Sequence, residues 1–129
     1  MMKPVQLFRK NEQPFDLPND NKASVLALVN VSNSDTLGAG IGIFDAGCDV
    51  PWTVTYDEVL FIHEGEFKLR AGDDVFNAGP GDSLWIPAGT ELIYDAPEAV
   101  TFFYAVAPVA NSPSTGVAKS YPTSPPDTE

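Results

Sequence analysis

The stretch that decides the fold is residues 56–67, YDEVLFIHEGEF. In a regular strand, successive side chains point to opposite faces of the sheet. Glu58 and Ile62 then share one face, while Val59, Phe61 and His63 share the other. If Glu58 points into the interior of the fold, His63, the single histidine of the chain, points away from it. Only a β-bulge would return His63 to the inner face.

Short apolar runs alternate with turn signals along most of the chain, and none shows a helical period. The runs are rich in Val, Ile, Phe and Tyr and are separated by Gly, Asp and Pro, which is typical of strands. The predicted strands are 24–32, 39–46, 53–65, 66–71, 74–78, 83–88, 91–96 and 100–107. They predict an all-β domain, a jelly-roll barrel of antiparallel strands, over residues 23–110. An N-terminal arm (1–22) and a Pro/Ser/Thr-rich tail (111–129) flank it.

The net charge of −11 excludes two classes of partner, because nucleic acid and anionic membranes repel such a surface. No apolar run is as long as a membrane span, and the first residues lack the apolar segment of a secretory signal. The sequence also lacks the GxxxxGK[ST] motif that holds nucleotide phosphates. The single Cys48 excludes an internal disulfide and fits a reducing compartment, so we expect a cytoplasmic protein.

Two short motifs have a specific spacing. Glu58 and Gly65, with six residues between them, match the end of the first sequence block of the cupin superfamily. Gly81, Pro87 and Gly89, within AGPGDSLWIPAGT (78–90), match the second block. The chain therefore resembles the cupins over about residues 40–107, and the resemblance implies a cupin jelly-roll barrel.

The metal ligands of the cupin blocks are missing. Cupins usually hold a metal with three histidines and one glutamate, and only Glu58 matches this set. The histidine positions fall, according to the spacing used, on Trp52 and Val54, Pro51 and Thr53, or Thr53 and Thr55, and the third falls on Leu92. Hydroxyl groups are poor ligands for transition metals. We therefore expect no metal and no other cofactor; Cys48, Asp49 and His63 are the residues that could form an unexpected site.

A closer resemblance rests on three runs: PWTVTYDEVLFIHEGEF (51–67), AGPGDSLWIPAGTEL (78–92) and FFYAVAP (102–108). They are similar to the ethanolamine-utilisation cupins, the EutQ-like family, in which WT-x-x-YDE also replaces the histidine-rich stretch. The resemblance implies a metal-poor cupin, usually a dimer, linked to the breakdown of small amines and aldehydes. It also implies an acetate-kinase-like activity, because that reaction has been assigned within the family.

The candidate site is an isolated carboxyl group among aromatic residues. Burial disfavours the charged carboxylate and would raise the pKa of Glu58, and a carboxyl group with a pKa near neutrality suits proton transfer. Glu58 is therefore the candidate acid/base, and Tyr56 and Tyr94 are candidate catalytic phenols that could donate to a developing oxyanion. The predicted pocket residues are Trp52, Thr53, Thr55, Leu92 and Tyr104.

Three functions remain open at this point. The first is a metal-independent enzyme that enolises, epimerises, dehydrates or cleaves a small amine, aldehyde or carboxylate. The second is a module that binds such a molecule without turnover, and the third is an accessory or structural protein. In the last case Glu58 would serve the structure by hydrogen bonding to Thr53, Thr55 or Tyr56.

The same alternation of faces bears on assembly. Val59 and Phe61 would be exposed on the outer face of a monomer, which predicts a homodimer. The N-terminal arm could add a strand to the neighbouring subunit. In the last strand, either Phe102 and Tyr104 or Phe103 faces inward, and the sequence does not choose between them.

Overall fold

The computed structural model describes residues 5–9, 23–111 and 118–121. These ranges contain ten strands and one short 3-10 helix. The strands are β1 (Ala23–Val29), β2 (Gly38–Phe44), β3 (Cys48–Thr53), β4 (Asp57–Glu64), β5 (Phe67–Ala71), β6 (Asp74–Ala78), β7 (Ser83–Ile86), β8 (Glu91–Ala96), β9 (Val100–Ala107) and β10 (Ala118–Tyr121). The 3-10 helix η2 (Val109–Asn111) follows β9. Within the described ranges, no helix has the length and apolarity needed to cross a membrane.

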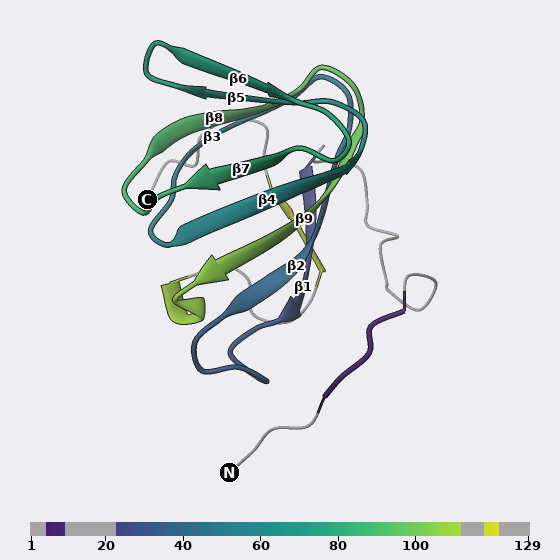
Figure 1. Cartoon of the computed structure of the whole chain (residues 1–129), viewed down its shortest axis with the longest axis vertical. Coiled ribbons are helices and arrows are strands. Elements are labelled where there is room, and N and C mark those ends of the chain that lie inside the picture. Colours follow the sequence, from purple (N-terminus) through teal and green to yellow (C-terminus); the bar gives the residue numbers. More distant parts are fainter. Residues whose placement is uncertain (1–4, 10–22, 112–117, 122–129) are drawn as a thin grey trace.

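The strands form two antiparallel sheets that face each other (Figure 1). The larger sheet has the order β10-β1-β2-β9-β4-β7, and the smaller has the order β3-β8-β5-β6. Strands that are neighbours in a sheet are often far apart in the sequence, as with β2 and β9. This is the all-β jelly-roll architecture that the sequence predicts, and that prediction is confirmed.

Two strands differ from the sequence prediction. The predicted strand 53–65 is divided, because β3 ends at Thr53 and β4 begins at Asp57. Between them Val54 pairs with the turn after β7: its N–H donates to the Thr90 carbonyl at 3.1 Å. The unpredicted strand β3 contains Pro51, which has no N–H to donate. Pro51 is tolerated because β3 is an edge strand that pairs only with β8.

The second difference lies in the predicted tail. Residues Ala118–Tyr121 form β10, which pairs with β1 at the edge of the larger sheet. Strand pairing thus extends past residue 110, where the sequence analysis ends the barrel. The rest of the predicted tail from residue 112 onward, and most of the predicted arm, lie outside the described residues, and the three-part division of the chain stays a prediction.

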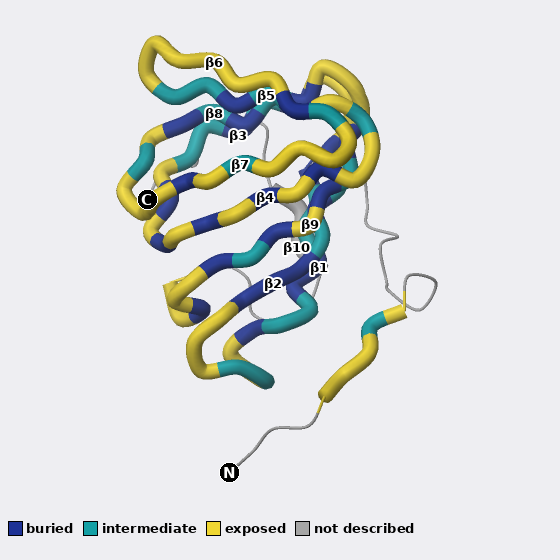
Figure 2. The backbone as a smooth tube through the Cα atoms, in the orientation of Figure 1, coloured by how far each residue is buried: buried dark blue, intermediate teal, exposed yellow. Residues whose placement is uncertain are grey.

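Burial alternates along β4 and β9, two neighbouring strands of the larger sheet (Figure 2). In β4, Glu58 and Ile62 are buried, while the residues between them at odd positions are exposed. In β9, Phe102 and Tyr104 are buried and Phe103 is exposed. The alternation predicted for β4 is confirmed, and the structure settles the choice that the sequence leaves open in β9.

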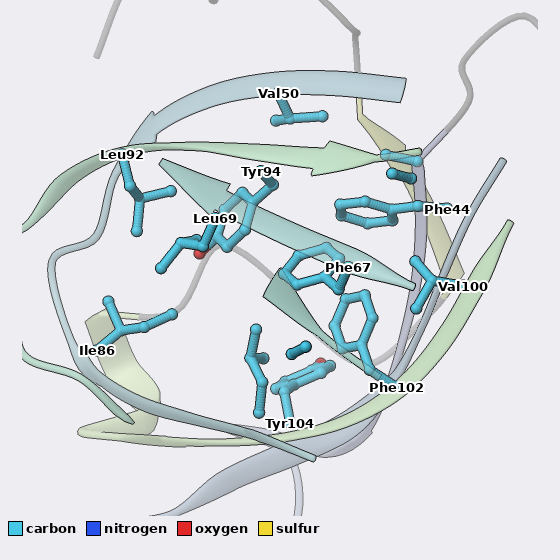
Figure 3. Close-up of a cluster of buried hydrophobic side chains, with 14 of the residues drawn as sticks. Phe44, Val50, Phe67, Leu69, Ile86, Leu92, Tyr94, Val100, Phe102 and Tyr104 are labelled. Atoms are coloured by element: carbon cyan, nitrogen blue, oxygen red, sulfur yellow. The ribbon is translucent and has the colours of Figure 1, made fainter. Parts of the chain in front are cut away.

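Four aromatic rings join the two sheets at the centre of the core (Figure 3). Phe44 and Phe102 come from the larger sheet, and Phe67 and Tyr94 come from the smaller. The ring centroid of Phe102 lies 5.2 Å from those of both Phe44 and Phe67. Ring pairs at such distances add to the stability gained by burying their area.

Two glycines of β2 make room for the rings of β9. A Cβ on Gly40 would lie 2.6 Å from the hydroxyl oxygen of Tyr104. A Cβ on Gly42 would lie 2.6 Å from Cε1 of Phe102 and would also contact its Cζ. The aromatic side chains of β9 therefore lie flat over a strip of β2 that has no side chains. This arrangement fixes the positions of Tyr104 and Phe102 in the core, opposite Leu60 and Ile62 of β4.

Candidate functional site

Glu58 is the buried carboxyl group of the fold. It lies near the start of β4, opposite Ile86 of β7 and Val106 of β9, and its side chain points between the sheets. Only 7% of its surface is exposed. Among the described residues, Glu58 is the only buried residue with a charged or ionisable carboxyl group, and Asn30 is the only buried amide side chain. A carboxyl group in such surroundings needs a hydrogen-bond partner or a proton.

The partner of Glu58 comes from the opposite sheet. The hydroxyl of Tyr94 in β8 donates a hydrogen bond of 2.8 Å to Oε1 of Glu58. The two residues are 36 positions apart in the sequence and belong to different sheets. This bond therefore crosses the interior of the sandwich, and it brings together two of the three predicted catalytic residues.

The environment of Glu58 changes its acidity. Burial raises its pKa from the ordinary 4.5 to about 7, because desolvation penalises the carboxylate more than the neutral acid. The hydrogen bond from Tyr94 acts in the opposite direction and is the smaller of the two effects. At neutral pH the protein therefore contains both the acid and the carboxylate form of Glu58.

Most of the other predicted site residues are buried around this pair. Tyr56, Leu92 and Tyr104 are buried members of the core cluster, and Trp52 is half-buried against it. Trp52 of β3 and Leu92 of β8 lie directly opposite each other in the smaller sheet. Leu60 and Ile62, further along β4, are fully excluded from solvent, whereas Glu58 keeps a small exposed fraction. Glu58 thus lies nearer to the start of β4 than these two residues and is slightly less buried than they are.

Thr53 and Thr55 do not belong to this group. Both are exposed, and Thr55 instead contacts the 3-10 helix after β9. Its hydroxyl donates to the carbonyl of Asn111 at 3.1 Å, and the Asn111 amide donates to the carbonyl of Thr55 at 3.0 Å. The structure thus does not bring Thr53 and Thr55 together with the pair of Glu58 and Tyr94. The physical reason is parity, because odd-numbered residues before Glu58 point to the face opposite the even-numbered ones.

The outward-facing residues near the site have structural contacts instead. The carboxylate of Asp57 accepts a hydrogen bond of 2.9 Å from the backbone N–H of Ala88, in the turn between β7 and β8. The backbone N–H of Gly89 in the same turn donates to the Val54 carbonyl at 2.8 Å. These bonds hold the turn against the segment that leads into Glu58. No sequence motif indicates the roles of Asp57 and Asn111, because their hydrogen-bond partners lie 31 and 56 residues away in the sequence.

His63 and Cys48 lie away from the carboxyl group. The pairing of β4 with β9 shifts register between Ile62 and Glu64, so a bulge does occur at His63. His63 is nevertheless exposed on the outer side, as the sequence predicts. Cys48 is a buried cysteine of the core, and it lies in β3 opposite Ala96 of β8. No three His, Cys, Asp or Glu side chains within the described ranges come together as a metal site would require.

The residues around Glu58 do not fit the metal that cupins usually hold. Some buried side chains flank Glu58 in the sequence, some pair with it in the sheet, and others line the same interior. All of them are apolar or phenolic: Val54, Tyr56, Ile86, Leu92, Tyr94 and Val106. The carboxylate oxygen that such a metal would need accepts the Tyr94 hydroxyl. We therefore derive no chemical step through a metal.

Comparison with known proteins shows the family of the chain. The sequence profile of the family described as ethanolamine utilisation protein EutQ matches residues 3–113. The chain belongs to the EutQ family. The acetate kinase EutQ of Salmonella typhimurium is 30% identical over 94 residues, which are 73% of this chain and 41% of that protein. The chain thus spans about two fifths of the length of the curated EutQ relatives it matches.

Solved structures show the same fold. A putative EutQ from Salmonella typhimurium superposes with a TM-score of 0.64 at 30% identity, over 67% of this chain and 70% of the other. An RmlC-like cupin from Shewanella frigidimarina superposes with a TM-score of 0.66 at 20% identity, over 83% of this chain and 95% of the other. The recognition of a EutQ-like cupin from its sequence runs is therefore confirmed.

Proposed function

We propose that this EutQ-family cupin takes a small metabolite into the end of the barrel at Glu58 and that Glu58 transfers a proton to or from it. The observation that supports the proposal is the buried pair of Glu58 and Tyr94, with a hydrogen bond of 2.8 Å and a Glu58 pKa of about 7. A general base is most effective when its pKa is near the working pH, because it is then both available and strong enough.

The proposed step is removal of a proton from the carbon next to a carbonyl group. The carboxylate of Glu58 takes the proton, and the C–H electron pair moves into a new C=C bond while the carbonyl oxygen gains negative charge. Once Glu58 is protonated it is a poorer acceptor for the Tyr94 hydroxyl. That hydroxyl is then available to donate to the new oxyanion. Return of a proton to the same face regenerates the substrate with a proton from solvent, and return to the opposite face inverts the configuration of the carbon.

The charges around the interior favour particular substrates. Three basic side chains are described, those of Arg9, Lys68 and Arg70, and none belongs to the buried core. Arg70 of β5 lies on the outer face of the smaller sheet, where its Nε donates to Asp95 at 2.7 Å. An anionic substrate would therefore meet the Glu58 carboxylate without a compensating cation. Within the predicted class of amines, aldehydes and carboxylates, we favour aldehydes, including those that also carry an amino group.

The test is proton exchange with solvent. We would incubate the protein in deuterated buffer with small aldehydes, amino aldehydes and ketones and follow loss of the α-proton signal by NMR. Wild type should exchange this proton, and Glu58→Gln should lower the rate about 100-fold or more, which is within the range for a lost general base. Glu91→Gln, an equally conservative change at an exposed position of β8, is the matched control and should exchange like wild type. Equal rates in Glu58→Gln and wild type would refute the proposal.

A non-catalytic binding role is the second candidate, and an accessory role, which the dense packing of aromatic side chains in the interior favours, is the third. A ligand that binds the folded state raises the unfolding temperature as its concentration rises. Thermal stabilisation by ethanolamine or acetaldehyde, with no proton exchange in any compound, would support binding without turnover.

The name of the curated relatives supports a further alternative, an acetate-kinase-like activity. Its test is formation of acetyl phosphate from acetate and ATP by the purified chain.

We also propose that the protein is a cytoplasmic homodimer. The single cysteine of the chain, Cys48, excludes an internal disulfide, which fits a reducing compartment.

A further inference from the structure

Trp52 is an inward-facing aromatic residue that is not fully buried. Side chains of a strand alternate between its faces, so Cys48, Val50 and Trp52 share the inner face of β3. The first two are 2% and 4% exposed. Trp52, the last of the three, is half-buried and packs against the core cluster. Its side chain is therefore both part of the core and accessible to solvent.

The register of the strands places Trp52 beside the pair of Glu58 and Tyr94. Tyr94 of β8 lies opposite Val50 of β3, and Trp52 is the next residue of β3 on the same face. Trp52 is therefore a diagonal neighbour of Tyr94, at a spacing of about 7–8 Å that aromatic side chains can span. The Tyr94 hydroxyl in turn donates to the carboxyl group of Glu58. An indole ring and a buried carboxyl group thus belong to the same small region.

This region lies at one end of the core. Trp52 lies opposite Leu92 in the smaller sheet, and Glu58 lies opposite Ile86 in the larger sheet. Figure 3 shows both Leu92 and Ile86 on the side of the core away from Phe44. Glu58 and Trp52 thus share one end of the core, away from the cluster of rings around Phe44.

The chemistry of this end favours a positively charged group. The face of an aromatic ring attracts a cation, and the indole ring of tryptophan attracts it most strongly. The Glu58 carboxylate attracts the same cation by charge, and burial weakens the screening of that attraction. Lys68 and Arg70 of β5 lie on the outer face of the smaller sheet, so neither neutralises Glu58. A ligand with an ammonium group fits both the ring and the carboxylate.

We propose that the indole ring of Trp52 binds a protonated amino group of the substrate, so that the site selects amino aldehydes over neutral aldehydes of the same shape. Trp52 is then a specificity-determining residue, because its ring holds the ammonium group while Glu58 acts on the carbon next to the carbonyl. A cation held there also favours the carboxylate form of Glu58, which is the form that accepts a proton. The choice of substrate rests on the proposed function, whereas the binding of a simple ammonium ion does not.

Two substrates of the same shape test the selectivity. Aminoacetaldehyde, which is protonated at neutral pH, carries an ammonium group where propanal carries a methyl group. We would measure exchange of their α-protons in deuterated buffer and take the ratio of the two kcat/KM values for each protein. The ratio removes any general loss of activity that a variant causes. Trp52→Leu should lower the ratio about 5- to 30-fold, and Trp52→Phe should lower it less because a phenyl ring still attracts a cation.

The matched control is the same change at the other tryptophan of the chain. Trp85 is 62% exposed, in β7 opposite Val59 on the outer side of the larger sheet, and Trp85→Leu should keep the wild-type ratio. An unchanged ratio in Trp52→Leu, or an equal fall in Trp85→Leu, would overturn the selectivity assigned to Trp52.

Binding of a simple ammonium ion separates this inference from the proposed reaction. The chain has two tryptophans, so in the Trp85→Leu variant the tryptophan fluorescence reports on Trp52 alone. Titration with propylammonium chloride should change this fluorescence until it saturates. Sodium chloride at the same ionic strength, and propan-1-ol as a neutral molecule of similar size, should not. Adding Glu58→Gln should weaken the binding several-fold, because the substitution removes the negative charge.

The outcomes distinguish the two proposals. Saturable binding of propylammonium, with no proton exchange in any compound, would refute the proposed reaction and support the ammonium site. A fluorescence that does not respond to propylammonium, or that responds equally to propan-1-ol, would refute the ammonium site even if Glu58 proves essential for proton exchange.

Discussion

Replacing Glu58 with glutamine should change how the stability of the protein depends on pH. Glu58 has a folded-state pKa of about 7, against an ordinary value of 4.5 that applies to the unfolded chain. Between these two values the folded state holds a proton that the unfolded state releases, so the free energy of unfolding falls as the pH rises. The contribution of Glu58 is fully present below pH 4.5 and is lost as the pH passes 7.

The size of this effect follows from the pKa difference. One pH unit of difference corresponds to about 1.4 kcal/mol, so the rise of the pKa from 4.5 to about 7 corresponds to about 3 kcal/mol in total. Roughly 2.5 kcal/mol of this falls between about pH 5 and about pH 8.5. The substituted glutamine side chain would be neutral at every pH and would keep a carbonyl oxygen for the Tyr94 hydroxyl. The variant should therefore be the more stable protein at about pH 8.5 by about 2 to 3 kcal/mol.

The assay is urea unfolding of both proteins at constant ionic strength from about pH 5 to about pH 8.5, followed by far-ultraviolet circular dichroism. The 17 other acidic residues, from a total of 18 Asp and Glu, contribute equally to both proteins and cancel in the difference. The difference in unfolding free energy between the variant and wild type should rise with pH and level off above a pH of about 7. A difference that stays constant across this range would refute both the raised pKa and the burial argument on which it rests.

Three further predictions test the packing around the site. Tyr94→Phe should raise the pKa of Glu58 further, because it removes the hydrogen bond that lowers it, and ¹³C NMR of the carboxyl carbon would measure the change. An unchanged or lower pKa would contradict this. Gly42→Ala should cost about 1–3 kcal/mol in urea unfolding, because the new methyl group meets the aromatic ring above it, while Gly79→Ala, with nothing within 4 Å, should cost far less. Equal costs would contradict the close packing of β2 and β9. Asn111→Ala should lower the unfolding free energy by about 1 kcal/mol through loss of its amide hydrogen bond, and no change would mean that the 3-10 helix does not hold the loop.

Much of the fold could be predicted from local sequence, and the failures of that prediction have local causes. The residues of β4 alternate by the geometry of a strand, so the inner position of Glu58 and the outer position of His63 followed directly. Strand β3 was missed because Pro51 is unusual in a sheet, and only its place at an edge makes it acceptable. Thr53 and Thr55 were assigned to the pocket against the alternation of faces, and the same alternation could have excluded them.

The sequence by itself determined the fold class, the family and the face on which each side chain of β4 and the neighbouring loop lies. These properties depend on spacing along the chain, which a strand converts into direction without help from distant residues. Only the tertiary structure decided that Tyr94 is the partner of Glu58 and that burial raises the pKa of that carboxyl group to about 7. Both depend on two sheets closing over each other, since desolvation comes from atoms that are remote in sequence and close in space.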